Sequence, residues 1–171
     1  MLNEVFEILD KFGSESVELM RDSHIQAGQV ASGRTLESFQ HAANIDADKV
    51  TLDIKAAEHS EFVDRGREPG GFPPIDNILQ WIEDKGLGAE FDREYKKRAF
   101  AFLIGRKIAA EGTYLHRTGS TQQGVEKPIS SVFSEQRIEE LQKQINKILN
   151  VELKSDFIKQ FKQHGYDIRN S

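Results

Sequence analysis

Cysteine is absent from this sequence of 171 residues, which excludes disulfide bonds, thiol catalysis and thiolate metal sites. Long apolar runs are absent as well, because no stretch approaches the roughly 18 apolar residues that a membrane-spanning helix requires. The first residues, Met1 to Glu4, lack the basic start and apolar segment of a secretory signal peptide. We therefore expect a chain without a membrane segment that is made and used in a cytoplasm.

The sequence also lacks an excess of positive charge, since 23 basic residues stand against 28 acidic ones and give a net charge of −5. The charge is uneven along the chain. Residues 1–64 hold 13 acidic and 5 basic residues, net −8, whereas residues 65–171 hold 15 acidic and 18 basic residues, net +3. Parts of opposite charge favour head-to-tail packing between copies of one chain, although chance separation of charge is the simpler alternative.

Proline is scarce, and three of the four prolines lie in residues 62–86 together with the only tryptophan. Residues 65–71, Arg-Gly-Arg-Glu-Pro-Gly-Gly, are unsuited to a helix interior or a central strand, because glycine costs backbone entropy there and proline lacks an N–H donor. This half of the stretch is therefore predicted to be a shaped loop.

The second half of the same stretch has the pattern of a short helix. Pro73 and Pro74 precede apolar residues at i, i+3, i+4 and i+7, and the pattern stops at Lys85 and Gly86. Lysine suits the negative end of a helix dipole, and glycine adopts the left-handed conformation that ends a helix. We expect Trp81, which flanks the apolar face, to belong to the core.

Upstream of this stretch, apolar residues at helical spacing predict one long amphipathic helix over residues 2–29, straight or kinked where Gly13 interrupts the apolar pattern. Residues 35–45 and 49–57 are predicted to be strands, the second more clearly because apolar and polar residues alternate in it. A turn at residues 46–48 would join these two segments into an antiparallel hairpin.

Downstream, a helix is predicted over residues 91–111. Residues 99–105 within it are apolar all round, so we expect this middle to be buried on most sides, with basic residues at both ends of the helix. Another helix is predicted from the N-cap Ser134 to about Asn150, with a continuation that would end at Gly165.

Residues 113–133 show no periodicity and are rich in glycine and serine. A loop of this length is uncommon within a compact domain and is usually functional or disordered. We expect it to leave the body of its own subunit and to contact a neighbouring one.

Together these elements predict a single α+β domain over residues 1–171. It consists of an α+β core (1–112), a long loop (113–133) and a C-terminal helix with a tail (134–171). In the core, a small antiparallel β-sheet follows the N-terminal helix, and two central helices pack on one face of that sheet.

Several motifs in fixed order resemble the tail-completion proteins of tailed bacteriophages and prophages, a group of head-tail connector or neck proteins. SGRTLESF (residues 32–39) is similar to the signature that opens the β-sheet in that family. The loop-helix stretch RGREPGGFPPIDNILQWIEDKG (residues 65–86) and IGRKIAAEG (residues 104–112) follow in the family's order. One departure is that Gly112 leads into Thr-Tyr-Leu-His-Arg, where family members commonly carry an aromatic-Pro-Phe element.

The resemblance implies a structural virion protein without enzymatic activity or cofactor. It implies a homo-oligomeric ring of six or twelve copies in the virion neck, between the capsid connector and the tail, with a passage for DNA. The partners would be other copies and the neighbouring connector and tail proteins. Because binding residues usually lie on loops that a rigid scaffold displays, we expect an interface at Arg65, Gly66, Arg67, Pro69, Gly70, Gly71, Phe72 and Arg117.

Two alternatives to the neck function also assign the chain a non-enzymatic role. One is another prophage or virion ring component, such as a head-side adaptor. The other is a nucleic-acid-binding protein that uses Arg65, Arg67, the basic cluster at residues 93–98, Arg106, Lys107 and Arg117. A pI of 5.6 argues against the second alternative, because binding by counterion release needs a basic surface.

Catalytic alternatives are weaker. Glu58, His59, Glu61 and Asp64 bring together side chains that bind divalent metals or move protons, but their spacing fits no known metal motif. The glycines at 66, 70 and 71 resemble a phosphate-binding loop without the Gly-Lys-Ser/Thr that contacts phosphate and metal.

Overall fold

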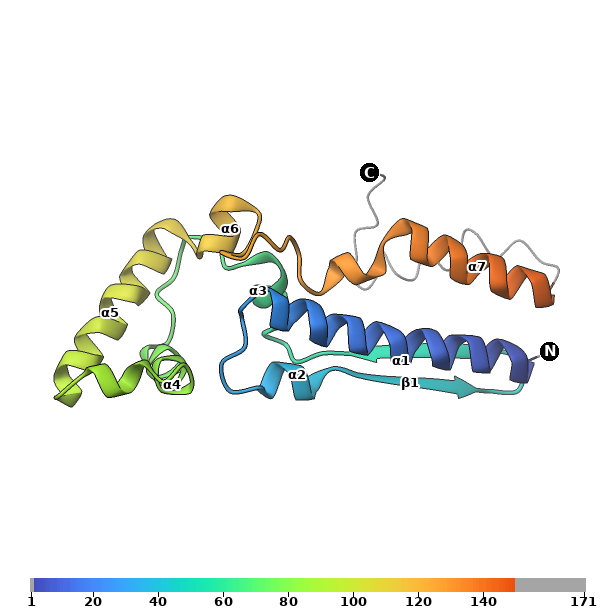
Figure 1. Ribbon diagram of the computed structural model, residues 1–171, viewed down its shortest axis with the longest axis horizontal. Coiled ribbons are helices and arrows are strands. Elements are labelled where there is room, and N and C mark those ends of the chain that lie inside the picture. The colour runs from blue at the N-terminus through green and yellow to red at the C-terminus, as the bar shows by residue number, and fades with distance from the viewer. Residues whose placement is uncertain (1, 150–171) are drawn as a thin grey trace.

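The computed structural model describes residues 2–149, which form an elongated α+β molecule of two parts (Figure 1). One part contains the long helix α1 (Leu2–Gln26), a β-hairpin and the helix α7 (Glu135–Leu149). The other contains α4 (Ile75–Asp84) and α5 (Glu94–Glu111). The remaining elements are short: α2 (Arg34–Ser38), α3 (Ser60–Arg65), η1 (Leu87–Glu90), α6 (Tyr114–Thr118) and η2 (Ser130–Phe133).

The predicted long N-terminal helix is confirmed as α1, which runs continuously through Gly13. Gly13 is buried against the hairpin, where an added Cβ would lie 2.7 Å from Leu52 Cδ1 and 2.8 Å from His41 Cδ2. The glycine therefore allows the helix and the hairpin to approach closely, and it does not interrupt the helix.

The predicted hairpin is present as β1 (Gln40–Ile45) and β2 (Val50–Lys55), which pair antiparallel in the register Ile45 to Val50. Its turn lies at the predicted residues, where the Asp46 N–H donates to the Lys49 carbonyl at 2.9 Å. Residues 34–38, however, are the short helix α2, so the first predicted strand begins too early.

A long-range contact explains why α2 forms. The guanidinium of Arg21 donates to the Leu36 carbonyl at 3.2 Å and to the Phe39 carbonyl at 3.1 Å. The Leu36 carbonyl also accepts the N–H of the C-cap Phe39, so Arg21 adds a second donor there and holds the C-terminal end of α2 against α1. Strand pairing then starts beyond the buried Phe39.

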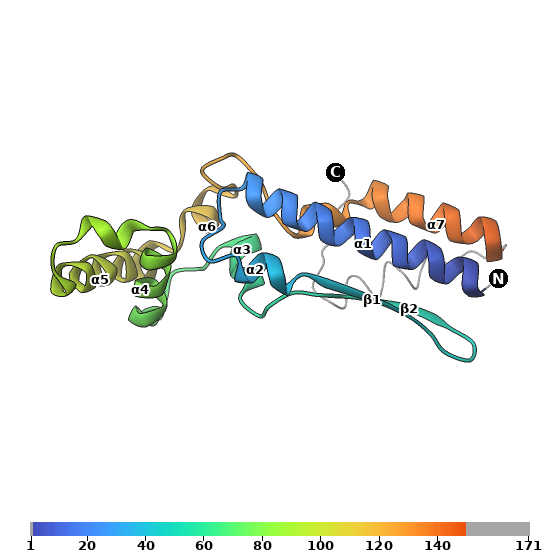
Figure 2. The same ribbon diagram turned by 60° about the horizontal axis from the view of Figure 1, so that its bottom comes forward.

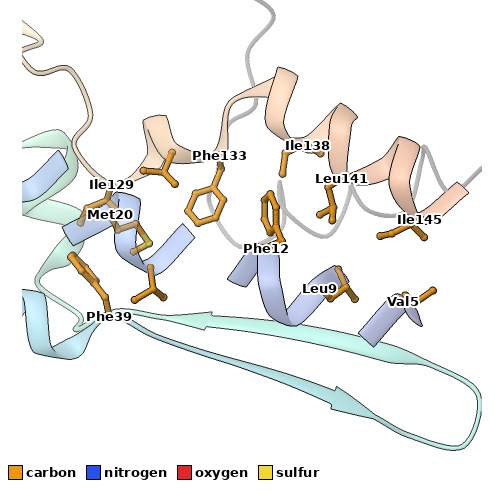
Figure 3. Close-up of a cluster of buried hydrophobic side chains, with 12 residues drawn as sticks. Val5, Leu9, Phe12, Met20, Phe39, Ile129, Phe133, Ile138, Leu141 and Ile145 are labelled. Atoms are coloured by element: carbon orange, nitrogen blue, oxygen red, sulfur yellow. The ribbon is translucent and has the colours of Figure 1, made fainter. Parts of the chain in front are cut away.

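The main core lies along α1, which packs between the hairpin and α7 (Figure 2). As Figure 3 shows, Val5, Leu9 and Phe12 of α1 face Ile138, Leu141 and Ile145 of α7. The helix α7 begins after Ser134, as predicted. Its predicted continuation from Asn150 to Gly165 lies outside the described residues.

The segment 113–133 belongs to the body of its own subunit, so the prediction of a loop that leaves it is wrong. The segment includes α6 and η2, and Ile129, Val132 and Phe133 are buried in the main core (Figure 3). These apolar residues pack in the same cluster as Met20 and Phe39. The prediction was based on the glycines and serines of the segment and overlooked its apolar residues.

The helices α4 and α5 do not pack on the sheet, contrary to the prediction. Ile78 and Ile82 of α4 form a separate cluster with Ala101 of α5, because each helix covers the apolar face of the other. The helix α4 begins and ends where predicted, but Trp81 is 41% exposed and therefore not part of the core.

Polar contacts join the two parts. The Lys85 Nζ atom donates to the carbonyl of Gly28 at 3.0 Å and to that of Val30 at 2.6 Å. Arg34 and Asp84 form an ion pair at 3.1 Å. The C-terminal end of α4 is thereby held against the connection between α1 and α2.

Candidate functional site: the central loop and the outer face of α5

The central loop (residues 65–72) leaves the end of α3 through Gly66. This glycine has a φ of 76°, and an added Cβ would lie 2.4 Å from the backbone nitrogen of His116. Any other residue would meet both a backbone clash and the cost of a left-handed conformation. The loop is therefore fixed where it approaches α6.

Hydrogen bonds attach the central loop to the end of α5 and the start of α6. Arg67 and Thr113 form two such bonds, Arg67 N to Thr113 Oγ1 and Thr113 N to Arg67 O, both 2.9 Å long. The Gly70 N–H donates to the Ala109 carbonyl at 2.9 Å. Gly112 makes room for this approach, since an added Cβ would lie 2.7 Å from the Arg67 oxygen. The loop motif and the end of the IGRKIAAEG motif thus meet in space.

Phe72 ends the central loop on the surface of α5. Its ring stacks on that of Phe102 with 5.3 Å between centroids. It also lies over Gly105, where an added Cβ would be 2.6 Å from Phe72 Cζ. Phe72 nevertheless remains 43% exposed, so it is anchored and still available for contact.

A shallow groove of about 400 Å³ follows the central loop. Arg65, Arg67 and His116 line it together with Glu61, Glu68 and the exposed ring of Phe62. The Arg67 guanidinium donates to the Gly71 carbonyl at 2.8 Å, so part of its hydrogen-bonding capacity stabilises the loop itself. Mixed charge around an aromatic ring suits a protein surface better than a single small anion.

The predicted interface residues are only partly brought together. Arg65 to Phe72 form one continuous surface feature, with Gly66 and Arg67 half-buried. Arg117 lies on α6 and pairs with Glu111 at the end of α5, and it does not line the groove. The structure therefore separates Arg117 from the central loop, because its side chain pairs with Glu111 of the preceding helix α5.

Two of the residues considered for metal binding or catalysis, Asp64 and His59, make contacts within the fold. The Asp64 carboxylate is buried and accepts the backbone N–H groups of Ile129 and Ser130, each at 2.8 Å. His59 Nε2 lies 2.9 Å from the hydroxyl of Thr35. Within residues 2–149, no three histidine, aspartate or glutamate side chains are arranged to hold a metal ion.

The outer face of α5, defined as the side turned away from α4, is a feature that the sequence pattern did not predict. The expectation that residues 99–105 are buried on most sides is wrong, because only Ala101 and Gly105 are buried. Phe102 is 52% exposed and Leu103 is 51% exposed. A helix that is apolar all round is normally covered all round, and here the chain itself covers one side only.

In comparisons with known proteins, the sequence matches no family model, no curated protein and no solved structure. None of the helices within residues 2–149 is both long enough and apolar enough to cross a membrane.

Proposed function

We propose that this chain is a structural subunit of the neck of a tailed bacteriophage or prophage. As a tail-completion or head-tail joining protein, it forms a ring of six or twelve copies between the capsid connector and the tail. The DNA passes through this ring, and assembly takes place in the host cytoplasm. The observation that carries the proposal is the ordered set of motifs between residues 32 and 112.

The placement of these motifs supports the proposal. The central loop and the end of α5 are far apart in the sequence but are joined by two hydrogen bonds between Arg67 and Thr113 and by the bond from Gly70 N to Ala109 O. A loop held in this way presents Arg65 and Phe72 at fixed positions. Fixed presentation lowers the entropy lost on association, which is what a subunit that must join two large assemblies requires.

The charge of the chain allows DNA to pass beside it without being bound tightly. A net charge of −5 repels the phosphate backbone at long range, and the basic residues are interspersed with carboxylates such as Glu61 and Glu68 beside the central loop. Binding that depends on counterion release is therefore weak. A passage built from such subunits lets DNA slide through.

Charge reversal in the central loop tests this function. The double change Arg65→Glu, Arg67→Glu is introduced into the phage or prophage that encodes the chain, and the fraction of capsids joined to tails is counted by electron microscopy. The matched control is Lys49→Glu, Lys55→Glu, which reverses two exposed lysines on the hairpin. We expect separated capsids and tails for the loop variant and joined particles for the control.

Joined particles at the wild-type frequency in the loop variant would contradict the role given to the loop. Loss of capsid assembly itself would favour a head-side component instead. Retardation of DNA by the purified protein at physiological salt would favour the nucleic-acid-binding alternative.

A further inference from the structure

The outer face of α5 combines exposed apolar and basic side chains, of which Phe102 is partly covered by the stacked ring of Phe72. Phe102 and Leu103 are about half exposed, and Arg106 and Lys107 are exposed one turn further along the helix. The side chains of Arg106 and Lys107 make no ion pair within residues 2–149. Leu103, Arg106 and Ala110 follow i, i+3, i+7 spacing, so the exposed residues form a continuous stripe.

The outer face of α1, the side turned away from both the hairpin and α7, has the opposite character. Glu18, Asp22 and Ile25 follow i, i+4, i+7 spacing on this face, and all three are exposed. Ile25 is 55% exposed, and Leu19 is exposed at the edge of the stripe. Glu18 and Asp22 make no ion pair within the described part of the chain. This stripe is acidic around apolar side chains, whereas the α5 stripe is basic around them.

The two stripes do not meet within one molecule. Figures 1 and 2 show α5 at one end of the elongated molecule, beyond the C-terminal end of α1, with α7 and the N-terminus at the other. Among the described residues, α1 and α5 are not one of the pairs of elements that pack extensively against each other. Because the two complementary stripes lie apart within one chain, they can contact each other only between two copies of the chain.

We propose that the outer face of α5 docks onto the outer face of α1 of a second copy of this chain. The guanidinium of Arg106 and the ammonium of Lys107 then lie against Glu18 and Asp22 of the neighbour. The side chains of Phe102 and Leu103 bury against Leu19 and Ile25. The proposal deepens the neck function and rests on it for the closed ring.

The contact is heterologous, because it joins two different surfaces. The pair then keeps a free α1 stripe on one copy and a free α5 stripe on the other. Addition continues head to tail until the rotation per subunit closes a ring, and it would otherwise produce a filament. The uneven charge of the chain, negative before residue 65 and positive after it, follows the same polarity.

Two charge-reversal variants test this interface. One carries Arg106→Glu and Lys107→Glu on α5, and the other carries Glu18→Lys and Asp22→Lys on α1. Sedimentation velocity is measured for each full chain alone and for their equimolar mixture, over a concentration series up to about 0.5 mM. We expect the wild type to associate, each variant alone to remain monomeric, and the mixture to associate again, since each variant restores the partner that the other lacks.

A control and a second variant keep the outcome interpretable. Lys143→Glu with Lys147→Glu reverses two exposed lysines on α7 and should associate like the wild type. Leu103→Ser removes apolar contact without changing charge and should weaken association, while circular dichroism shows that its fold is retained.

A wild type that stays monomeric, or a mixture of the two charge-reversal variants that does not associate, would overturn the interface. If the purified chain fails to associate but imaged particles carry it at the neck, the proposed function stands and only the interface is rejected. If the chain associates but the particles lack it, the interface stands and only the function is rejected.

Discussion

The buried carboxylate of Asp64 accepts the backbone N–H of Ile129 at 2.8 Å, across 65 positions of sequence. The same oxygen accepts the N–H of Ser130. This contact fixes the entry of the segment 113–133 into the main core, where Ile129 packs beside Met20 and Phe39. A residue that the sequence offered as a metal ligand is thus an anchor between α3 and η2.

Replacement of Asp64 by alanine should destabilise the fold. The change leaves two backbone N–H groups without their acceptor in a buried place, which costs about 2 kcal/mol or more. The free energy of unfolding from urea titration measures the effect, with the exposed Asp48→Ala in the hairpin turn as the matched change. Equal stability of the two variants would show that water replaces the carboxylate at no cost.

The change Gly66→Ala should be more costly than Gly71→Ala. At Gly66 the left-handed backbone and the His116 nitrogen both oppose a Cβ, and we expect a loss of more than about 2 kcal/mol. At Gly71 an added Cβ meets no atom within 4 Å, and the expected change is below about 0.5 kcal/mol. Thermal melting of the two variants measures the difference, and similar melting temperatures would contradict the tight approach to α6.

Neighbouring residues of α4 should respond very differently to truncation. Ile82 is completely buried between α4 and α5, so Ile82→Ala should cost about 2–5 kcal/mol. Trp81 points outward, so Trp81→Ala should cost less than about 1 kcal/mol despite the larger side chain. Chemical denaturation of both variants decides the matter, and a larger loss for Trp81 would place the indole in the core after all.

The stability of the protein should fall in mild acid because of His24. Burial lowers the pKa of His24 below its ordinary value, and the positive charge of Lys85 acts in the same direction. Between the ordinary value of about 6.5 and the lowered one, the unfolded chain binds more protons than the folded chain, so this contribution to stability is lost as the pH falls below about 6.5.

Urea titrations at pH 7.5 and 5.5 measure this contribution when the wild type is compared with His24→Leu. The variant should lose less stability than the wild type on acidification. An unchanged pH dependence in His24→Leu would remove His24 as the cause.

Features set by neighbouring residues were predictable from the sequence. The limits of α4 follow from Pro74 and Lys85, and the hairpin turn follows from alternating residues on either side of Asp46, because each of these signals acts within a few residues. The glycine-rich stretch was recognisable as a loop for the same reason.

Features set by distant contacts were not predictable. The helix α2 depends on Arg21, and the central loop depends on Thr113, 46 positions after Arg67. The exposure of Phe102 and Trp81 depends on how many other elements cover α4 and α5. The spacing of apolar residues within one helix gives no information about this cover. The candidate site was therefore found as a stretch of sequence, while its attachment and the outer face of α5 required the fold.

Electron cryomicroscopy of particles from the phage or prophage that encodes this chain tests the neck function most directly. The chain carries a small affinity tag at its C-terminus, and the purified particles are imaged and averaged about the capsid-tail axis. We predict six or twelve copies of the α1–α7 fold in a ring at the junction of capsid and tail. Purified particles that lack the chain, or that carry it as a single copy away from the axis, would contradict the proposed function.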